Sequence, residues 1–287
     1  MTSKKSTYED PPEHIPFGSL EHLEWGQVSL FKQTEILQKI HDKILNPKDS
    51  KAMVIAMSLI SIIETSRSVL LLARHNVRDS YALSRILLDS TLNLGYYSVD
   101  DEMVKKALQY LHQKSFRDMF RELDLETMNA SNKLDEDIEM TLPQNLMEAF
   151  TEFTNGEGNE IRNWYGAKRK DVFKRIKIIE AKHGEKIGKI LNLCVFSIYR
   201  HSSEIIHGTL FGTCYGIGLT ENNFKKPLNK DEHTEYINQM NAYLMSILNL
   251  MMETIVRIIN VDYPIEDLLK ESNGYTTHLN TMVTKQE

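Results

Sequence analysis

Cysteine is almost absent from this sequence, with only Cys194 and Cys214 among 287 residues. Both lie in apolar stretches, and neither belongs to a CxxC pair or to a Cys/His spacing that holds zinc. This scarcity excludes a disulfide framework and a structural zinc site, and it is typical of a reducing compartment. We therefore predict a cytoplasmic protein whose two thiols fill the core.

A long hydrophobic run without charge is also missing. A helix that spans a bilayer needs about 20 apolar residues, but the two most apolar stretches, 52–73 and 237–260, each contain a glutamate and an arginine. The first 18 residues have no apolar segment and do not resemble a secretory signal. We predict no membrane contact, buried bundle helices for both stretches, and a flexible N-terminal lead over residues 1–18.

Neither sign of charge is in large excess, since 34 basic residues stand against 40 acidic ones and the net charge is -6. This balance gives no global field that attracts nucleic acid, so RNA binding would need a local basic patch. The sequence also lacks the glycine-rich dinucleotide and P-loop motifs, the GxSxG nucleophile elbow and the HExxH zinc motif. We therefore predict neither a cofactor nor a metal.

Helical periodicity covers most of the chain, and no segment has a convincing strand pattern. Short polar runs such as NPKDS, HNVRDS and NGEGN separate the periodic segments and indicate turns rather than domain linkers. Short connections between long helices favour antiparallel neighbours, so we predict an all-α antiparallel bundle of about eight helices. The single helical domain is expected over 19–271, followed by a flexible C-terminal tail over 272–287. The expected helices are 20–45, 51–74, 79–99, 101–129, 134–153, 170–183, 185–218 and 230–260.

The third expected helix carries an arginine and an acid where solvent-facing residues are few. Arg85 and Asp89 lie four residues apart within RILLDSTLNLGYY, so they share one side of the helix. Two interpretations are open. Either the two residues form a half-buried ion pair that serves packing, or Arg85 points into a pocket shared with other polar residues.

The most concentrated polar segment, YRHSSEIIHG, interrupts a strongly apolar helix. Seven residues make about two α-helical turns, so Arg200 and His207 fall within roughly 20° of each other around the helix. Ser203 and Glu204 lie between them on the same side, and Tyr199 precedes them. These five polar residues are our candidate catalytic residues. Four glycines follow at near-helical spacing, which predicts the close approach of a second backbone.

Three short motifs resemble a family of uncharacterised bacterial all-helical proteins: RILLDSTLNLGYY, NWYGAKRKD and YRHSSEIIHG. The last is similar to that family's Tyr...Ser-x-x-x-His-Gly motif, through Tyr199, Ser203, His207 and Gly208. The resemblance covers roughly residues 50 to 220. It implies the helical fold and no settled activity.

The spacing of Arg200 and His207, with six residues between them, also resembles the Arg-x(4-6)-His signature of HEPN-type helical ribonucleases. Polar His201 follows the arginine, as that signature favours. The resemblance implies that His207 transfers a proton at the ribose 2′-OH and that Arg200 steadies the scissile phosphate. Both roles suit the side chains, because imidazole titrates near neutral pH and guanidinium binds phosphate through two nitrogens.

The function that we predict from these motifs is a HEPN-like, metal-independent endoribonuclease. The same resemblance implies RNA as the substrate, a homodimer as the active form, and a role as a toxin or phage-defence effector. The competing prediction is a non-enzymatic module that binds a protein partner or senses a small ligand. In that case His207 satisfies a polar core by hydrogen-bonding Asp89 or Tyr199. The two predictions differ in exposure, since a nuclease needs its arginine and histidine open to RNA.

One local basic run is a candidate nucleic-acid-binding surface. Its members are Lys168, Arg169, Lys170, Lys174 and Arg175, with aromatic residues interleaved. Basic side chains hold a phosphate backbone while aromatic rings stack on bases. The same composition also describes a solvated helix face.

A di-metal centre is a further alternative. Glu204 and His207, like Glu180 and His183, have the Glu-x-x-His spacing that builds di-iron sites in helical bundles. The second pair ends a helix among lysines, where we expect solvent.

Overall fold

The computed structural model describes residues 14–119, 122–125, 128–131, 144–153, 172–219 and 228–284. Within these ranges the protein is an all-α bundle, as predicted. The main body consists of five helices: α1 (Leu20–Ile44), α2 (Ser50–Leu72), α3 (Val77–Tyr97), α10 (Lys230–Asp262) and α11 (Glu266–Met282). The remaining helices are α4 (Asp101–Met119), α5 (Gln144–Phe153), α6 (Val172–His183), α7 (Glu185–Cys194), α8 (Arg200–Ile206) and α9 (Leu210–Gly216).

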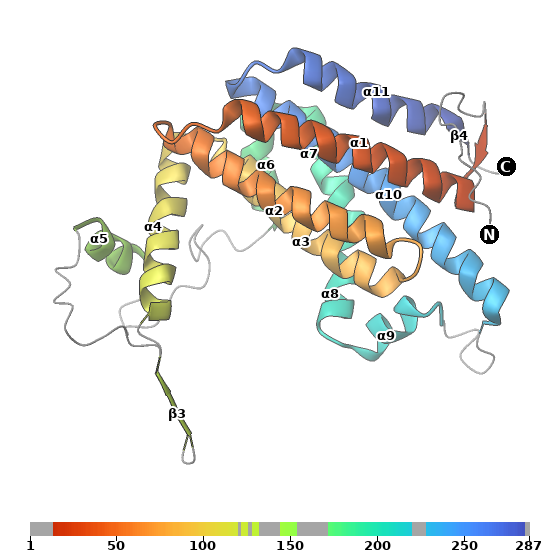
Figure 1. The fold of residues 1–287 in the computed structure, drawn as a ribbon, viewed down its shortest axis with the longest axis horizontal. Helices are drawn as coiled ribbons and strands as arrows, with labels where there is room; N and C mark the ends of the chain where they lie inside the picture. Colours follow the sequence, from red (N-terminus) through yellow and green to blue (C-terminus); the bar gives the residue numbers. More distant parts are fainter. Residues whose placement is uncertain are drawn as a thin grey trace.

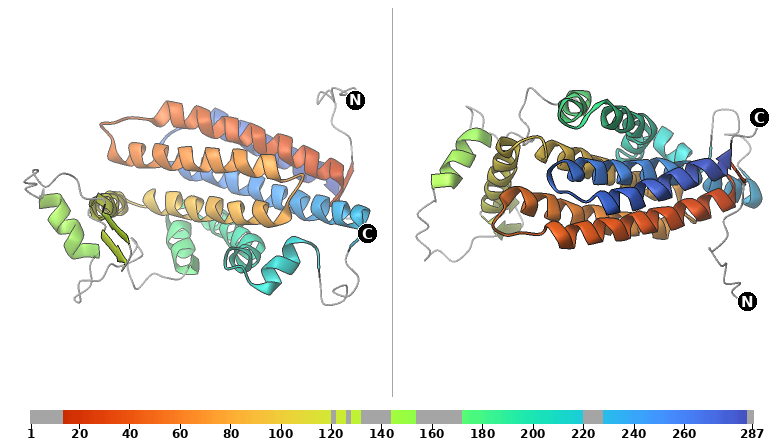
Figure 2. Two further views of the ribbon diagram at one scale, coloured as in Figure 1. Left: turned by 60° about the horizontal axis from the view of Figure 1, so that its bottom comes forward. Right: turned by 90° about the horizontal axis from the view of Figure 1, so that it is seen from above.

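The five helices of the main body lie side by side along the length of the molecule (Figure 1). Short turns join α1, α2 and α3, so consecutive helices run antiparallel, and α10 packs against both α1 and α3. Helices α6 to α9 cover one side of this body, with α7 on α10 and α8 on α3 (Figure 2). The polar segment at α8 is therefore held against the bundle by α3.

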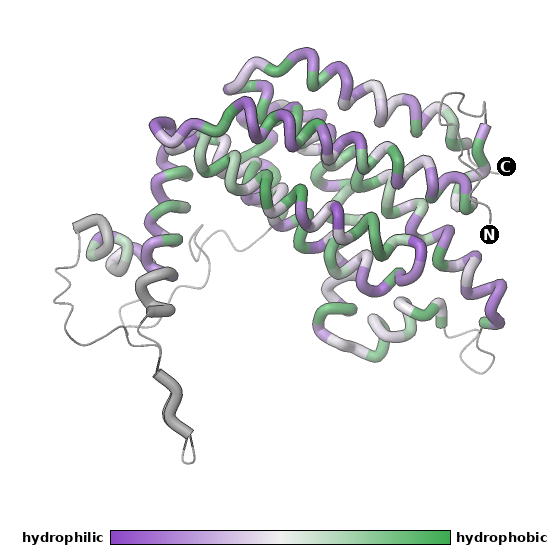
Figure 3. Tube along the Cα trace, viewed as in Figure 1, coloured by the Kyte–Doolittle hydropathy of each residue, from purple (hydrophilic) through white to green (hydrophobic). Residues whose placement is uncertain are grey.

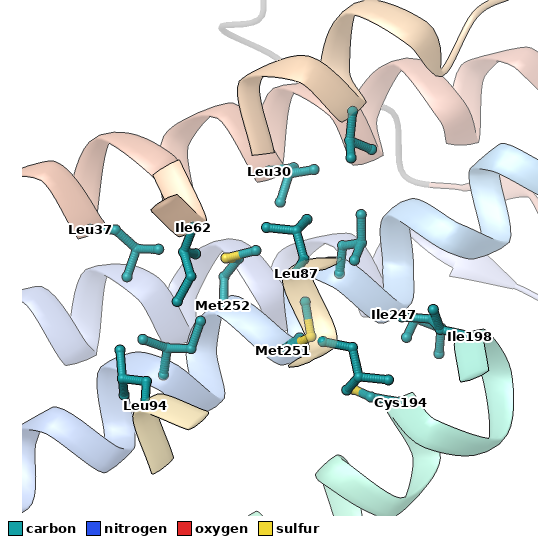
Figure 4. Packing of buried hydrophobic residues seen from close by; sticks show 14 of the residues in the cluster. Leu30, Leu37, Ile62, Leu87, Leu94, Cys194, Ile198, Ile247, Met251 and Met252 are labelled. Carbon is teal, nitrogen blue, oxygen red and sulfur yellow. The ribbon is translucent and has the colours of Figure 1, made fainter. Parts of the chain in front are cut away.

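The core is built around α10, whose apolar side chains meet those of the surrounding helices (Figure 4). Met251 of α10, Leu87 of α3 and Cys194 of α7 lie together there. Burial raises the pKa of the Cys194 thiol to about 12, which keeps it an inert core filler. Cys214 is half-buried. Along α1 and α11 hydrophobic and hydrophilic residues recur with the period of the helix, as Figure 3 shows.

Two described helices, α2 and α10, are long and apolar enough to cross a membrane by length and composition alone. In the bundle, 72% of the apolar window of α10 is buried, and 39% of that of α2. The core helix of a folded bundle meets the same criteria, and α10 occupies that position.

Side-chain caps set the beginnings of the long helices. The Ser19 hydroxyl accepts a hydrogen bond from a first-turn N–H of α1 at 3.1 Å. The Asp49 carboxylate accepts two from α2, at 2.9 and 3.0 Å. At α10, Asn229 and Glu232 each bind the other's backbone N–H. Each cap contributes about 1 kcal/mol, so the polar runs between helices act as specific start signals.

Two buried polar residues join α1 to α10. The His22 imidazole is fully buried, where its Nδ1 accepts from the Gly18 N–H at 3.0 Å and its Nε2 lies 2.8 Å from the Ser246 hydroxyl. Burial lowers the pKa of His22 to about 4, so the ring is neutral near pH 7. The Asn249 amide bonds a backbone carbonyl of each helix and accepts from the Ser29 hydroxyl at 2.7 Å.

The flexible tail predicted over 272–287 is wrong, because α11 continues to Met282. The face that α11 turns to α1 carries Ser272 and Thr276, which look solvent-exposed in the sequence but are buried. Gln33 of α1 satisfies both, donating to the Ser272 carbonyl at 2.9 Å and to the Thr276 hydroxyl at 3.0 Å. Strand β4 (Val283–Thr284) then pairs in parallel with β1 (Ile15–Pro16).

The helix predicted over 101–129 ends at Met119. An antiparallel hairpin follows, formed by β2 (Glu122–Leu125) and β3 (Met128–Ser131). In β2 apolar and acidic residues alternate, which is the period of a strand and not of a helix.

Candidate functional site

The segment predicted as one helix over 185–218 is divided into four pieces. After α7, a π-helix over Val195–Tyr199 leads into α8. Gly208 then ends α8 with φ +64°, and its N–H and that of Thr209 bond back to the carbonyls of Ile205 and Glu204. This is a Schellman motif, which requires a residue free to adopt the left-handed conformation. His207 is therefore the last residue before the turn.

The turn folds α9 back onto α8. A Cβ atom at Gly212 would lie 2.5 Å from the backbone carbonyl oxygen of Glu204, so the two helices touch there without an intervening side chain. The predicted close approach of a second backbone is present at this glycine, and its partner is the neighbouring helix α8. Gly218, with φ +72°, ends α9 by a second Schellman motif.

The predicted catalytic residues take different positions along α8. Arg200 begins the helix and His207 follows its end, and both side chains are exposed. Neither makes a hydrogen bond or an ion pair with the part of the chain that the structure describes. Ser203 is half-buried, and the Glu204 carboxylate accepts from the Thr209 hydroxyl at 2.8 Å. An internal hydrogen bond from His207 to Asp89 or Tyr199 is absent among these residues.

Tyr199 instead forms a contact with α3. The Arg85 guanidinium lies over the Tyr199 ring, 3.3 Å from its centroid. Arg85 also donates from Nε to the Asp89 carboxylate at 2.8 Å, and its side chain is 16% exposed. Arg85 thus forms the half-buried ion pair of the first interpretation and also contacts the Tyr199 ring, but it does not line the pocket beside this segment. Through this contact Tyr199 joins the start of α8 to α3.

His201 belongs to an aromatic cluster that the sequence did not suggest. Its ring stacks on Tyr215 of α9 with centroids 4.4 Å apart and planes 5° apart. Phe211 lies nearly parallel at 6.3 Å, and Tyr81 of α3 meets the ring edge-on at 6.4 Å. Burial, and secondly the charge of Arg200, lower the pKa of His201, so the imidazole is neutral near pH 7. Its Nδ1 is buried without a hydrogen-bond partner among the described residues.

A pocket of about 580 Å³ opens beside this cluster; we call it the aromatic pocket. It is lined by Tyr81, Val172, Phe173, Val195, Phe196, Ser197, Tyr199, Arg200, His201, Tyr215, Met240 and Tyr243. Of the predicted catalytic residues, Tyr199 and Arg200 line it, whereas Ser203, Glu204 and His207 do not. Arg200 is thus the link between the exposed side of α8 and the pocket.

The predicted basic run lies only partly within the described residues. Lys168, Arg169 and Lys170 lie outside them, and Lys174 is exposed on α6. Arg175 cannot belong to a surface patch, because its side chain is buried at 5% exposure and donates to the Asn93 amide oxygen at 3.0 Å. The periodicity of α6 turns Arg175 toward α3, while Lys174 and Lys177 are exposed.

The residues considered for a di-metal centre are not gathered. No group of three or more His, Cys, Asp or Glu side chains with metal-binding spacing occurs within the described ranges. The expectation of a solvated His183 is wrong, since the ring is half-buried and its Nε2 lies 3.0 Å from the Ser98 hydroxyl. Burial lowers the pKa of His183 to about 4.

The family model that matches this chain is described as a family of unknown function, DUF5677, and the match covers residues 52–244, which is 193 of 287. The chain belongs to this family. The DUF5677 region runs from α2 into α10, so it contains α8, the aromatic pocket and the contact between Arg85 and Tyr199. No curated protein and no solved structure matches the chain.

Several residues of the site in this DUF5677 member have no signal in the local sequence. The walls of the aromatic pocket come from α3, α6, the π-helix, α8, α9 and α10. Phe211 and Tyr215, spaced four residues apart on α9, could have been paired from the sequence. The pairing of Tyr81 with Tyr215, at 5.6 Å, depends on how α3 meets α9.

Proposed function

We propose that this chain is a HEPN-like, metal-independent endoribonuclease. The observation that carries the proposal is the exposure of Arg200 and His207 at the two ends of α8, with neither side chain paired within the described part of the chain. An exposed guanidinium without a protein partner can bind an RNA phosphate. An exposed imidazole without a protein partner can take the proton of a ribose hydroxyl.

The proposed reaction is a transesterification within the RNA strand. His207 takes the proton of a ribose 2′-OH, and the 2′-oxygen attacks the adjacent phosphorus. The bond from phosphorus to the 5′-oxygen breaks, and the proton passes from His207 to that leaving oxygen. Arg200 binds the phosphate oxygens and offsets their developing charge. The products are a 2′,3′-cyclic phosphate and a free 5′-hydroxyl, so no water is consumed.

We propose a homodimer as the active form. Arg200 and His207 lie about 10 Å apart along α8, and an antiparallel, two-fold pairing of α8 from two copies would bring the arginine of one toward the histidine of the other. Exposed apolar side chains flank this helix, with Ile206 at 53% and Leu210 at 72% exposure. Such residues are typical of the core of a protein interface.

The biological role that we propose with this activity is a cytoplasmic toxin or phage-defence effector. Its RNA substrate is in the cytoplasm, and a reducing compartment suits a chain with one buried and one half-buried free thiol. The HEPN resemblance supports the effector role.

The test is cleavage of a mixed RNA in EDTA by the wild type and by His207→Ala and Arg200→Gln. General acid–base catalysis is worth about 100- to 10,000-fold, so His207→Ala should lose at least 100-fold in rate, with cyclic-phosphate ends in the wild-type products. His278→Ala is the matched control, because His278 is an exposed histidine on α11, on the other side of the bundle (Figure 1). Equal cleavage by wild type and His207→Ala would overturn the assignment.

The aromatic pocket favours a second candidate, a non-enzymatic module that senses a small ligand or binds a protein partner. A largely aromatic pocket with a few polar groups is the usual form of a ligand site. If this candidate is correct, RNA stays intact with the wild type and with every variant, and the Tm of the protein rises when the ligand is added. The version of this candidate in which His207 satisfies a polar core is less favoured, because the His207 side chain is exposed.

A further inference from the structure

The aromatic pocket has the chemistry of a nucleobase site. Six of its twelve lining residues are phenylalanine or tyrosine, against 8% aromatic residues in the whole chain. Aromatic rings offer flat apolar faces on which any base stacks. The volume of about 580 Å³ also suits one nucleotide, since small-ligand pockets span about 300 to 1,000 Å³.

Among the described residues that line the pocket, Phe196 of the π-helix is the most exposed aromatic residue, at 79%. A large part of its apolar ring therefore contacts water. A base that stacks on this ring would remove that apolar surface from water.

The charge of the pocket determines which chemical group can bind next to the base. Among the described lining residues, Arg200 alone is charged, because His201 is neutral near pH 7. A single guanidinium at an aromatic opening attracts an anion and repels a cation. At the polar edge of the pocket the Ser197 and Tyr243 hydroxyls lie 2.7 Å apart, with donors and acceptors that match a base edge.

We infer that the aromatic pocket holds one base of the RNA strand, with the adjoining phosphate on Arg200. This inference rests on the proposed ribonuclease function and names the element of the substrate that positions it. The base stacks on the exposed ring of Phe196. Its phosphate then lies at the start of α8, on the side of the helix that leads to His207.

The experiment measures binding without cleavage. A fluorescein-labelled 2′-O-methyl tetranucleotide has no 2′-OH and cannot be cut, so its anisotropy with the full-length protein reports binding alone. Nucleoside monophosphates should displace it, whereas ribose 5-phosphate and inorganic phosphate should displace it at least tenfold less well. Phe196→Ala should weaken binding about tenfold, because stacking is worth roughly 1–3 kcal/mol per base. Leu193→Ala is the matched control, as Leu193 is an exposed apolar residue that does not line the pocket.

The outcomes separate this inference from the proposed function. Displacement by monophosphates that Phe196→Ala weakens, together with intact RNA, would support the base site and overturn the ribonuclease. Cleavage that depends on His207, with the same KM for wild type and Phe196→Ala, would support the ribonuclease and overturn the base site. Equal displacement by ribose 5-phosphate and by the monophosphates would also overturn it, since only phosphate would then be recognised.

Discussion

The contact between Arg85 and Tyr199 makes a prediction whose size follows from its geometry. The guanidinium carbon lies 3.3 Å from the ring centroid, and the Arg85 side chain is 16% exposed. Cation–π pairs contribute about 0.5–1 kcal/mol at exposed sites and about 2 kcal/mol when desolvated. The ion pair of Arg85 with Asp89 adds at most about 0.5 kcal/mol, because Asp89 is 41% exposed and solvent screens it. We expect a coupling energy of about 1.5 kcal/mol between Arg85 and Tyr199.

The assay is a double-mutant cycle by urea unfolding, with Arg85→Met, Tyr199→Leu and the double variant. The double variant should be more stable than the sum of the two single losses predicts, by the coupling energy. Asp89→Asn is the control that removes the ion pair and leaves the ring contact, and it should cost about 0.5 kcal/mol or less. Raising the salt should reduce only this smaller loss.

A coupling energy below about 0.5 kcal/mol would refute the argument, since that is the range of an exposed pair. Arg85 would then stabilise α3 alone and would not hold the start of α8. Both single variants should also lower RNA cleavage without abolishing it, because they loosen the helix that carries Arg200 while leaving its side chain in place.

Three further predictions concern stability. The unfolding free energy should fall by up to about 3 kcal/mol as the pH is lowered from 6.5 to 4, because the pKa of His22 is about 6.5 in the unfolded chain and about 4 in the folded one. Urea unfolding of His22→Gln should show a smaller dependence of this free energy on pH. Asn249→Leu should cost about 2–4 kcal/mol, since it leaves the Ser29 hydroxyl and a backbone carbonyl unsatisfied; an unchanged urea midpoint would contradict this. Gly212→Ala should destabilise by about 1–3 kcal/mol, because the new methyl meets backbone atoms of α8; calorimetry should show a lower Tm, and Gly274→Ala, which meets no atom within 4 Å, should not.

The helical body could be predicted from the sequence because its signals are local. The stretch around α10 has the apolar periodicity of a core helix, and capping residues such as Asp49 and Asn229 mark the helix starts. The end of α11 could not be predicted, since two of its four buried residues carry hydroxyl groups. Ser272 and Thr276 become core residues only because Gln33, more than 230 positions earlier, satisfies them.

The site was predictable in composition but not in arrangement. The polar residues of YRHSSEIIHG identify the segment, and α-helical spacing places Arg200 and His207 on one side of α8. The position of His207 at the end of the helix depends on the turn at Gly208, and the neutral state of His201 depends on its burial beside Tyr215. The prediction that Arg175 belongs to a surface patch was wrong, because nothing in the charged run around it indicates that this residue faces α3.

The π-helix before α8 makes the length of a five-residue stretch as important as its composition. Deleting one residue from Val195–Tyr199 would restore α-helical winding and turn everything after it by about 100°. Arg200 and His207 would keep their alignment with each other, but Arg200 would turn away from the aromatic pocket that it now lines. A family member with a one-residue gap here would therefore keep the polar motif but lose its connection to the pocket. A comparison of the motif residues alone would not distinguish such a member from one without the gap.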